Sequence, residues 1–183
     1  TKDRATDLLG VELQEDYIEN LNRNGIKCIT SLKNLKDNSV DSVFCFHTLE
    51  HLSEPLEILK EFNSKLKVGG HAIIEVPHAN DFLLREMNCL EFKDFTLWSQ
   101  HLILHTRYSL KLFLEMAGFK NFSIQGKQRY KLSNHLSWLR YGNPGGHKSV
   151  SSAIDTDALT QAYESSLQML DATDTLIAIV SKT

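Results

Sequence analysis

The segment His47–His51 of the 183-residue chain, His-Thr-Leu-Glu-His, places two histidines and a carboxylate close together. The pattern H-x-x-E-H matches the inverted zinc-protease signature, whose chemistry needs both histidines and the glutamate on one helix. Here His47 directly follows the apolar run Val40–Phe46, so the pattern crosses from a predicted strand into a loop. Metal-dependent hydrolysis through His47, Glu50 and His51 therefore stays a minor alternative, and we predict no metal site.

Three further histidines are candidates for acid–base chemistry, because histidine titrates near neutral pH. His101 and His105 are four residues apart, a spacing that would place them on one face of a helix as metal ligands or a proton relay. Packing or capping contacts are the alternative for at least one of them. His78 follows the apolar run His71–Val76, where a doubly wound sheet opens its crevice, and is the better candidate to contact an acceptor. We predict His78, His101 and His105 as the catalytic residues.

Glu12 lies near the end of another apolar run, Leu8–Leu13. A carboxylate at the carboxyl end of the second strand of a doubly wound sheet is placed to accept both hydroxyls of a bound ribose. A solvated glutamate at a strand end is the alternative interpretation. Glu12 is therefore a candidate for nucleoside binding if the neighbouring elements form such a sheet.

Apolar runs and helical periods predict the elements that position these residues. Strands are predicted at Leu8–Leu13, Ile26–Ile29, Val40–Phe46, His71–Val76, Lys120–Tyr130 and Thr175–Ser181. Helices are predicted at Glu15–Asn24, Ser53–Val68, Ser109–Ala117 and Ala158–Leu170. Strands that alternate with helices indicate an α/β fold with a doubly wound, mostly parallel sheet, covered by helices on both faces.

Two stretches of the sequence carry a resemblance to a known family. Residues 40–77 read VDSVFCFHTLEHLSEPLEILKEFNSKLKVGGHAIIEVP, with an Asp entering a strand, Leu-Glu-His after it and a Lys-x-Gly-Gly turn before the next strand. Residues 101–119 read HLILHTRYSLKLFLEMAGF, a His-rich entry to a helix that ends in Ala-Gly-Phe. In this order the motifs resemble class I S-adenosylmethionine-dependent methyltransferases from about Leu8 to Phe122, with Thr175–Ser181 as the seventh strand.

The resemblance implies S-adenosylmethionine as the cofactor and a set of residues that hold it. By matched positions these are Glu12, Leu13, Ser31, Leu32, Phe46 and His47. Glu12 would hold the ribose hydroxyls, with Leu13 beside the adenine. Ser31 and Leu32 would lie at the adenine edge. Phe46 and His47 would face the methionine portion. Ser31 stands where the family often has an acidic residue.

One departure from the family is large. Its first strand and Gly-x-Gly loop should precede Leu8, but the segment Thr1–Asp7 contains no glycine. Because that strand lies at the centre of the family's sheet, its absence would leave unpaired strand edges on both sides. We therefore expect a methyltransferase fold without its first strand and glycine loop, and a truncated N-terminus as the simpler explanation.

The segment Lys131–Ala172 interrupts the last two predicted strands and is irregular before its helix. It is similar to an insertion in methyltransferases of bacterial surface-polysaccharide and sugar biosynthesis. Long insertions in compact domains are usually functional or disordered, so we predict an acceptor-side cap, with a dimerisation arm as the alternative. The predicted organisation is a single domain over 1–183, with core strands in 1–130, the insertion in 131–172 and the final strand in 173–183.

Composition limits the partners. The net charge is −3, without the clustered Lys and Arg that nucleic acid or an anionic membrane surface requires. The three cysteines lack metal-ligand spacing, which is typical of reduced thiols and predicts a cytoplasmic location. We predict a small-molecule acceptor, sugar-like or quinone-like, methylated on oxygen or carbon, with neither nucleic acid nor membrane as a partner and a homodimer left open. A non-catalytic binding or scaffolding module of the same fold is the rival from another class.

Overall fold

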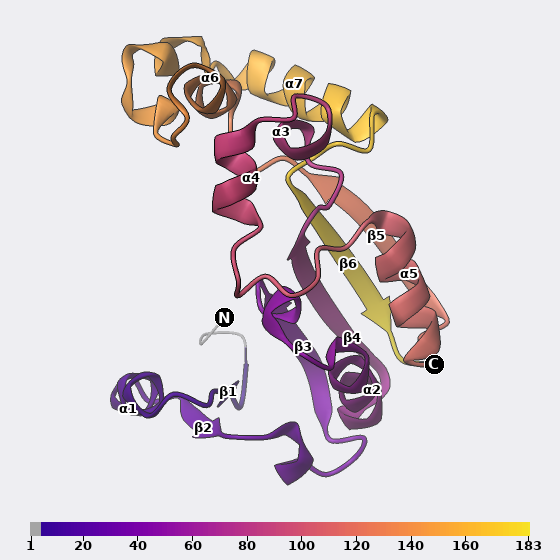
Figure 1. The fold of residues 1–183 in the computed structure, drawn as a ribbon. Coiled ribbons are helices and arrows are strands. Elements are labelled where there is room, and N and C mark those ends of the chain that lie inside the picture. The colour runs from indigo at the N-terminus through magenta and orange to yellow at the C-terminus, as the bar shows by residue number, and fades with distance from the viewer. Residues whose placement is uncertain (1–4) are drawn as a thin grey trace.

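The computed structural model describes residues 5–183; residues 1–4, part of the segment before Leu8, lie outside the described residues. The strands form two sheets, a parallel pair β1-β2 and a four-stranded sheet in the order β3-β4-β6-β5 (Figure 1). Among the described residues no strand is hydrogen-bonded between β1 and β3, so the two sheets are separate. None of the helices in this part of the chain has the length and apolar character to cross a membrane.

The N-terminal unit carries the first parallel pair. Its elements are β1 (Leu9–Val11), α1 (Glu15–Arg23) and β2 (Lys27–Ile29). The chain leaves α1 through Gly25, whose φ of 73° is left-handed, a conformation that glycine adopts without a Cβ clash. The 3-10 turn η1 (Leu32–Asn34) follows β2 and lies beside α2, where Leu32 packs against the main core. This contact joins the unit to the larger sheet.

The larger sheet contains the strands that lead to the histidines. They are β3 (Val40–Phe46), β4 (Leu66–Pro77), β5 (Asn121–Lys127) and β6 (Thr175–Ser181). β3 and β4 run parallel, whereas β6 runs antiparallel to both of its neighbours, β4 and β5. At one end of β6 Thr175 lies opposite both Pro77 and Lys127. β6 is therefore paired on both edges along its whole length.

Two helices cover one face of this sheet, α2 (Pro55–Lys65) and α5 (Arg107–Met116) (Figure 1). Pro55 occupies the first turn of α2, where a missing N–H costs nothing. Thr106 and Ser109 form a reciprocal capping box at the start of α5. The core between helices and sheet is at most 6% exposed and includes Cys45, Leu59, Ala72, Ile74, Val76, Leu110, Leu114, Leu176, Ala178 and Val180.

The opposite face of the four-stranded sheet is partly open. Phe44 pairs with Ile73, and Ile73 with Ile179, so these three side chains point to the same side, away from the core. Phe44, Phe46 and Ile179 are 52%, 51% and 44% exposed. The prediction that helices cover both faces is therefore wrong for this sheet within the described residues, because both of its covering helices, α2 and α5, lie on the other side.

The remaining helices gather beyond the carboxyl ends of β3, β4 and β5 (Figure 1). They are α3 (Phe82–Arg85), α4 (Leu90–Thr96), α6 (Leu132–Tyr141), α7 (Asp157–Met169) and the 3-10 turns η3 (Gly146–Lys148) and η4 (Val150–Ile154). A small second core of Leu83, Cys89 and Trp138, with Phe92 against it, joins α3, α4 and α6. The sheet end that leads to the histidines is thus surrounded by helices.

Two local predictions fail at this end. His101 and His105 lie in the irregular segment between α4 and α5, so they do not share a helical face. α6 occupies Leu132–Tyr141, inside the stretch predicted to be irregular, because packing of Trp138 outweighs the weak helix propensities of its Ser and Asn residues. The strands β3 and β6 have the predicted bounds, and the predicted helix at Ala158–Leu170 is confirmed as α7 with a shift of one residue.

Candidate functional site

The carboxyl ends of β3 and β4 hold a histidine between two carboxylates. His47 directly follows β3 with a φ of 47°, which is uncommon for a residue with a side chain. Its Nδ1 lies 3.3 Å from Oε1 of Glu50, and its Nε2 lies 2.9 Å from Oε1 of Glu75 on β4. The Glu50 carboxylate, with Glu75, raises the pKa of His47, although partial burial and the charge of Arg129 oppose this. The protonated imidazole is therefore favoured.

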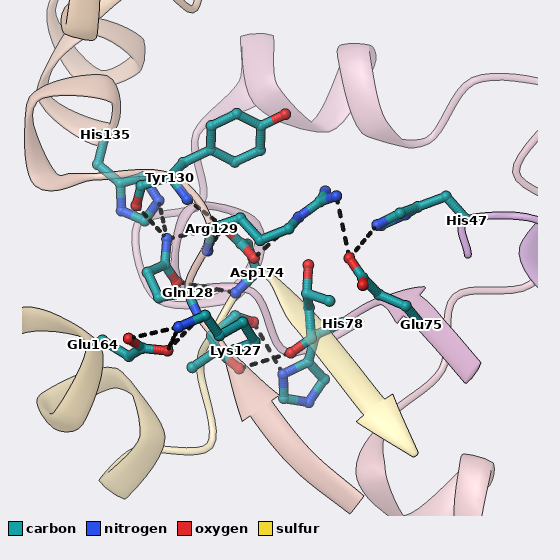
Figure 2. Close-up of polar contacts among 12 residues, drawn as sticks. His47, Glu75, His78, Lys127, Gln128, Arg129, Tyr130, His135, Glu164 and Asp174 are labelled. Carbon is teal, nitrogen blue, oxygen red and sulfur yellow. Dashed lines mark hydrogen bonds and ion pairs between the residues drawn. The ribbon is translucent and has the colours of Figure 1, made fainter. Parts of the chain in front are cut away.

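Arg129 extends this contact into a network along the sheet edge (Figure 2). Its Nη1 lies 3.4 Å from Oε1 of Glu75, and its Nε lies 3.9 Å from Oδ1 of Asp174. Oδ2 of Asp174 accepts the backbone N–H groups of Arg129 and Tyr130 at 2.9 and 3.0 Å, and the side-chain amide of Gln128 at 3.1 Å. The three donors follow β5 and Asp174 precedes β6, so one carboxylate closes the end of this strand pair.

The network continues into the segment between β5 and β6. Nε2 of Gln128 lies 3.2 Å from Nε2 of His135 on α6, and Nδ1 of His135 lies 2.7 Å from the hydroxyl of Tyr163 on α7. Burial lowers the pKa of His135 to about 4 and raises that of Tyr163 to about 12, so both are neutral at neutral pH. A neutral, fully bonded pair of this kind anchors α6 and α7 to the sheet.

His78 and His105 lie beside each other as an isolated parallel bridge, and both are fully buried. Nδ1 of His78 donates to the carbonyl oxygen of Thr173 at 3.0 Å, and Nδ1 of His105 lies 3.3 Å from Oγ of Ser109. Burial lowers the pKa of both imidazoles, although nearby carboxylates oppose it. Neither ring has an atom at the surface in this conformation, and the catalytic roles assigned to both stay predictions.

His101 is placed apart from His105. Its ring centroid lies 4.9 Å from that of His51, and its Nδ1 lies 2.7 Å from the carbonyl oxygen of Thr96. The segment that carries it is held by backbone hydrogen bonds to Glu50 rather than by helical ones. The predicted pairing of His101 with His105 is therefore wrong, and the structure pairs His101 with His51 instead.

The N-terminal unit carries four of the predicted cofactor residues. Oε1 of Glu12 accepts the backbone N–H groups of the next two residues at 2.7 and 3.0 Å, which fixes the carboxylate while the residue stays partly exposed. Leu13 beside it is 75% exposed. Ser31 caps the turn η1 through its hydroxyl, and Leu32 is partly buried against the core. With Phe46 and His47 at the end of β3, these six residues remain the predicted cofactor contacts.

Sequence reasoning missed Glu75, Arg129 and Asp174. Glu75 has a signal, because it is a charged residue within the apolar run Ala72–Val76. Asp174 has a weaker sequence signal, its position directly before the last strand, where a carboxylate can accept backbone N–H groups at the strand end. Arg129 has none, because its partners come from β4 and from the start of β6, which are distant in sequence.

Comparison with known proteins identifies the family. The sequence profile of a family described as a methyltransferase domain matches residues 5–124, whereas no curated protein matches the chain. A SAM-dependent methyltransferase from Archaeoglobus fulgidus superposes with a TM-score of 0.61 at 20% identity, over 95% of this chain and 75% of that chain. One from Thermotoga maritima, described as a possible histamine N-methyltransferase, gives 0.62 at 21% identity, over 96% and 73%.

A third solved structure is phosphoethanolamine N-methyltransferase 2 from Haemonchus contortus, in complex with S-adenosyl-L-methionine. It superposes with a TM-score of 0.56 at 17% identity, over 96% of this chain and 43% of that chain. At these identities the likeness shows the fold, and the family profile, which covers more than half of the residues, shows the family. The chain thus belongs to the methyltransferase domain family, and it is an enzyme of the class I methyltransferase fold, whose cosubstrate is S-adenosylmethionine.

Proposed function

We propose that the enzyme transfers the methyl group of S-adenosylmethionine to an oxygen or carbon of a small hydroxyl-bearing acceptor, sugar-like or quinone-like. The observation that carries the proposal is the charged pair of Glu75 and Arg129 at the carboxyl edge of the sheet. Their side chains are 20% and 38% exposed, and His47 beside them is 28% exposed. Ligands of open α/β sheets bind at this edge. Groups of both signs that remain accessible there suit an acceptor rich in hydroxyls.

The N-terminal unit offers a fit for the nucleoside part of the cosubstrate. The Glu12 carboxylate is fixed by backbone N–H groups through Oε1 yet partly exposed, so it retains acceptor capacity for the two ribose hydroxyls. Leu13 and Val11, 75% and 48% exposed, provide apolar surface for the flat adenine ring. Phe46 and His47 would lie at the methionine portion. The bound cosubstrate supplies an already activated methyl group, so these residues need only orient it.

The acceptor would lie on the other side of His47. Glu75 would accept a hydrogen bond from the reacting hydroxyl, and Arg129 would donate to a neighbouring oxygen. Residues 131–172 would act as the acceptor-side cap, because α6 and α7 lie beyond the strand ends and are tied to the edge through Gln128 and His135. A dimerisation arm is the alternative use of the same segment.

The proposal is tested first on the cosubstrate, by calorimetry on the full-length protein. Glu12→Gln should weaken S-adenosylmethionine binding about ten- to a hundredfold, because losing a hydrogen bond to a charged acceptor costs about 1.5–3 kcal/mol. Glu19→Gln is the matched control, since Glu19 is an exposed residue of α1 whose carboxylate pairs with Arg23 on the helix surface. Equal affinity of the two variants would refute the assignment of Glu12.

The acceptor is tested separately, by turnover on a panel of sugar and hydroquinone acceptors. Methylation of a hydroxyl or ring carbon in either class supports the proposal. Turnover confined to amine acceptors would overturn the acceptor class while leaving the cosubstrate site intact.

A further inference from the structure

A second cluster lies next to the proposed site, between the turn η2 (Leu49–His51) and the segment that follows α4. We propose that Glu50, His51 and His101 form a binding site for a zinc-like divalent cation. One ligand atom from each residue lies within 4.8 Å of the other two. The three side chains come from two segments that are distant in sequence, so their convergence is a product of the fold.

The two histidines present bare ring nitrogens to the cluster. Nδ1 of His51 lies 2.8 Å from the carbonyl oxygen of Gln100, and Nδ1 of His101 lies 2.7 Å from that of Thr96. A carbonyl oxygen only accepts, so each Nδ1 carries the proton and each Nε2 of the neutral ring keeps its lone pair. Metal-binding histidines typically donate their other ring N–H to a backbone carbonyl or carboxylate in this way.

The Glu50 carboxylate is buried and has an ion-pair contact with His47, but no hydrogen bond within the described part of the chain. It is 1% exposed, and neither of its oxygens has a hydrogen-bond partner among the described residues. Nδ1 of His47 lies 3.3 Å from Oε1 and is the charged neighbour described above, whereas Nε2 of His51, at 3.9 Å, carries a lone pair in the tautomer above. A buried carboxylate without a hydrogen bond is costly, and lone pairs that face it add to the cost. A cation among the three would satisfy all of them.

The surroundings hold the ligands in place without the cation. The carbonyl oxygen of Glu50 accepts the backbone N–H groups of Leu102 and Ile103 at 2.8 and 3.3 Å, which fixes the segment that carries His101 against η2. The Trp98 ring packs edge-on against both imidazoles, with centroids 5.8 Å from His101 and 6.5 Å from His51. The site is therefore built before any metal binds.

The donor set selects the class of metal. Two imidazoles and one carboxylate suit zinc and other first-row divalent ions, whereas magnesium and calcium prefer oxygen ligands. Three protein ligands leave one tetrahedral position open to water or another small ligand. This site differs from the H-x-x-E-H interpretation, because Nε2 of His47 is engaged with Glu75 and the third ligand is His101.

The test is a titration of the full-length, chelator-treated protein with zinc, followed by calorimetry and by the visible spectrum of bound cobalt(II). We expect about one ion per chain and a tetrahedral cobalt spectrum. His101→Ala and His51→Ala should each weaken zinc binding by more than about a hundredfold, beyond the usual effect of losing a residue that only supports a ligand. His71→Ala is the matched control, because His71 is exposed on β4, and it should bind zinc as the unchanged protein does.

Glu50→Gln separates the carboxylate from the imidazoles, and circular dichroism checks that each variant is folded. If this buried variant does not fold, the His51 and His101 variants, at partly exposed positions, decide the question alone. The proposal is overturned if zinc fails to bind at micromolar concentration, if magnesium binds as tightly, or if the His51 and His101 variants match the His71 control. Cosubstrate affinity is measured on the same samples, so failure of the metal site is distinguishable from failure of the methyltransferase assignment.

Discussion

Replacement of Asp174 tests whether one buried carboxylate holds the end of the β5-β6 pair. Its Oδ2 accepts three hydrogen bonds, two of them from backbone N–H groups, and the residue is 9% exposed. Asp174→Ala leaves these donors without their acceptor. Hydrogen bonds to a charged group contribute about 1.5–3 kcal/mol each, but the change also removes a carboxylate whose pKa burial raises.

The net cost should be that of breaking a buried charged network, about 3–5 kcal/mol. For a chain of this size that lowers Tm by about 6–20 °C, at about 2–4 °C per kcal/mol. Asp174→Asn keeps one carbonyl oxygen as an acceptor, so its loss should be smaller, about 1–2 kcal/mol. Asp41→Ala is the control, because Asp41 pairs with Lys67 at the surface and such pairs contribute at most about 1 kcal/mol.

Urea unfolding followed by circular dichroism measures all three variants under the same conditions. The order expected is Asp174→Ala least stable, then Asp174→Asn, then Asp41→Ala close to the unchanged protein. If both Asp174 variants are as stable as Asp41→Ala, the three donors find equivalent partners without the carboxylate, and the reasoning from the hydrogen-bond network is refuted.

Three other predictions concern the core, the pH dependence and the acceptor side. Leu114→Ala, at a fully buried position of α5, should lower the free energy of unfolding in urea by about 2–5 kcal/mol. Leu112→Ala, at a position 42% exposed on the same helix, should lower it by less than about 1 kcal/mol. Burial raises the pKa of Asp81 to about 7, above its unfolded value of about 4, so its contribution to stability is present below pH 4 and is lost as the pH rises through 7. Asp81→Asn, which keeps the helix cap, should lose less stability than the unchanged protein between pH 5 and pH 8; parallel curves would contradict this. Arg129→Met should raise the KM for the acceptor and leave the affinity for S-adenosylmethionine unchanged. A loss of that affinity would show that Arg129 contacts the cosubstrate rather than the acceptor.

The sequence predicted those elements whose patterns are local. β3 and β6 are short runs of β-branched and aromatic residues, so their bounds follow from neighbouring residues. Gly118 indicated where α5 ends to within one residue, but the helix begins at Arg107, two residues before the predicted start. α6 escaped prediction because Ser133, Asn134 and His135 favour a turn in isolation and become helical only with Trp138 packed against α3 and α4. Tertiary packing decided this element.

The site was harder to predict than the fold. The resemblance led to His47 and Glu12 because both directly follow or end a strand, where motif position and spatial position agree. His101 was assigned to the wrong partner, since a four-residue spacing implies a shared face only if the segment is helical. The contacts between His51 and His101, or between Arg129 and Glu75, join residues from separate elements, and no local pattern specifies such pairs.

The double pairing of β6 has a consequence for how this enzyme diversifies. Lys127 and Thr175, which flank the long segment bearing α6 and α7, lie opposite each other in the β5-β6 ladder, so that segment leaves and re-enters the sheet at nearly one point. The entropic cost of closing such a loop grows only slowly with its length. Residues between Tyr130 and Asp174, whose hydrogen bonds close the strand pair, can be exchanged, lengthened or shortened without shifting the strand register. If this segment caps the acceptor as proposed, acceptor preference can change while the framework stays constant, and Tyr130 and Asp174 are the natural boundaries for grafting one such segment in place of another.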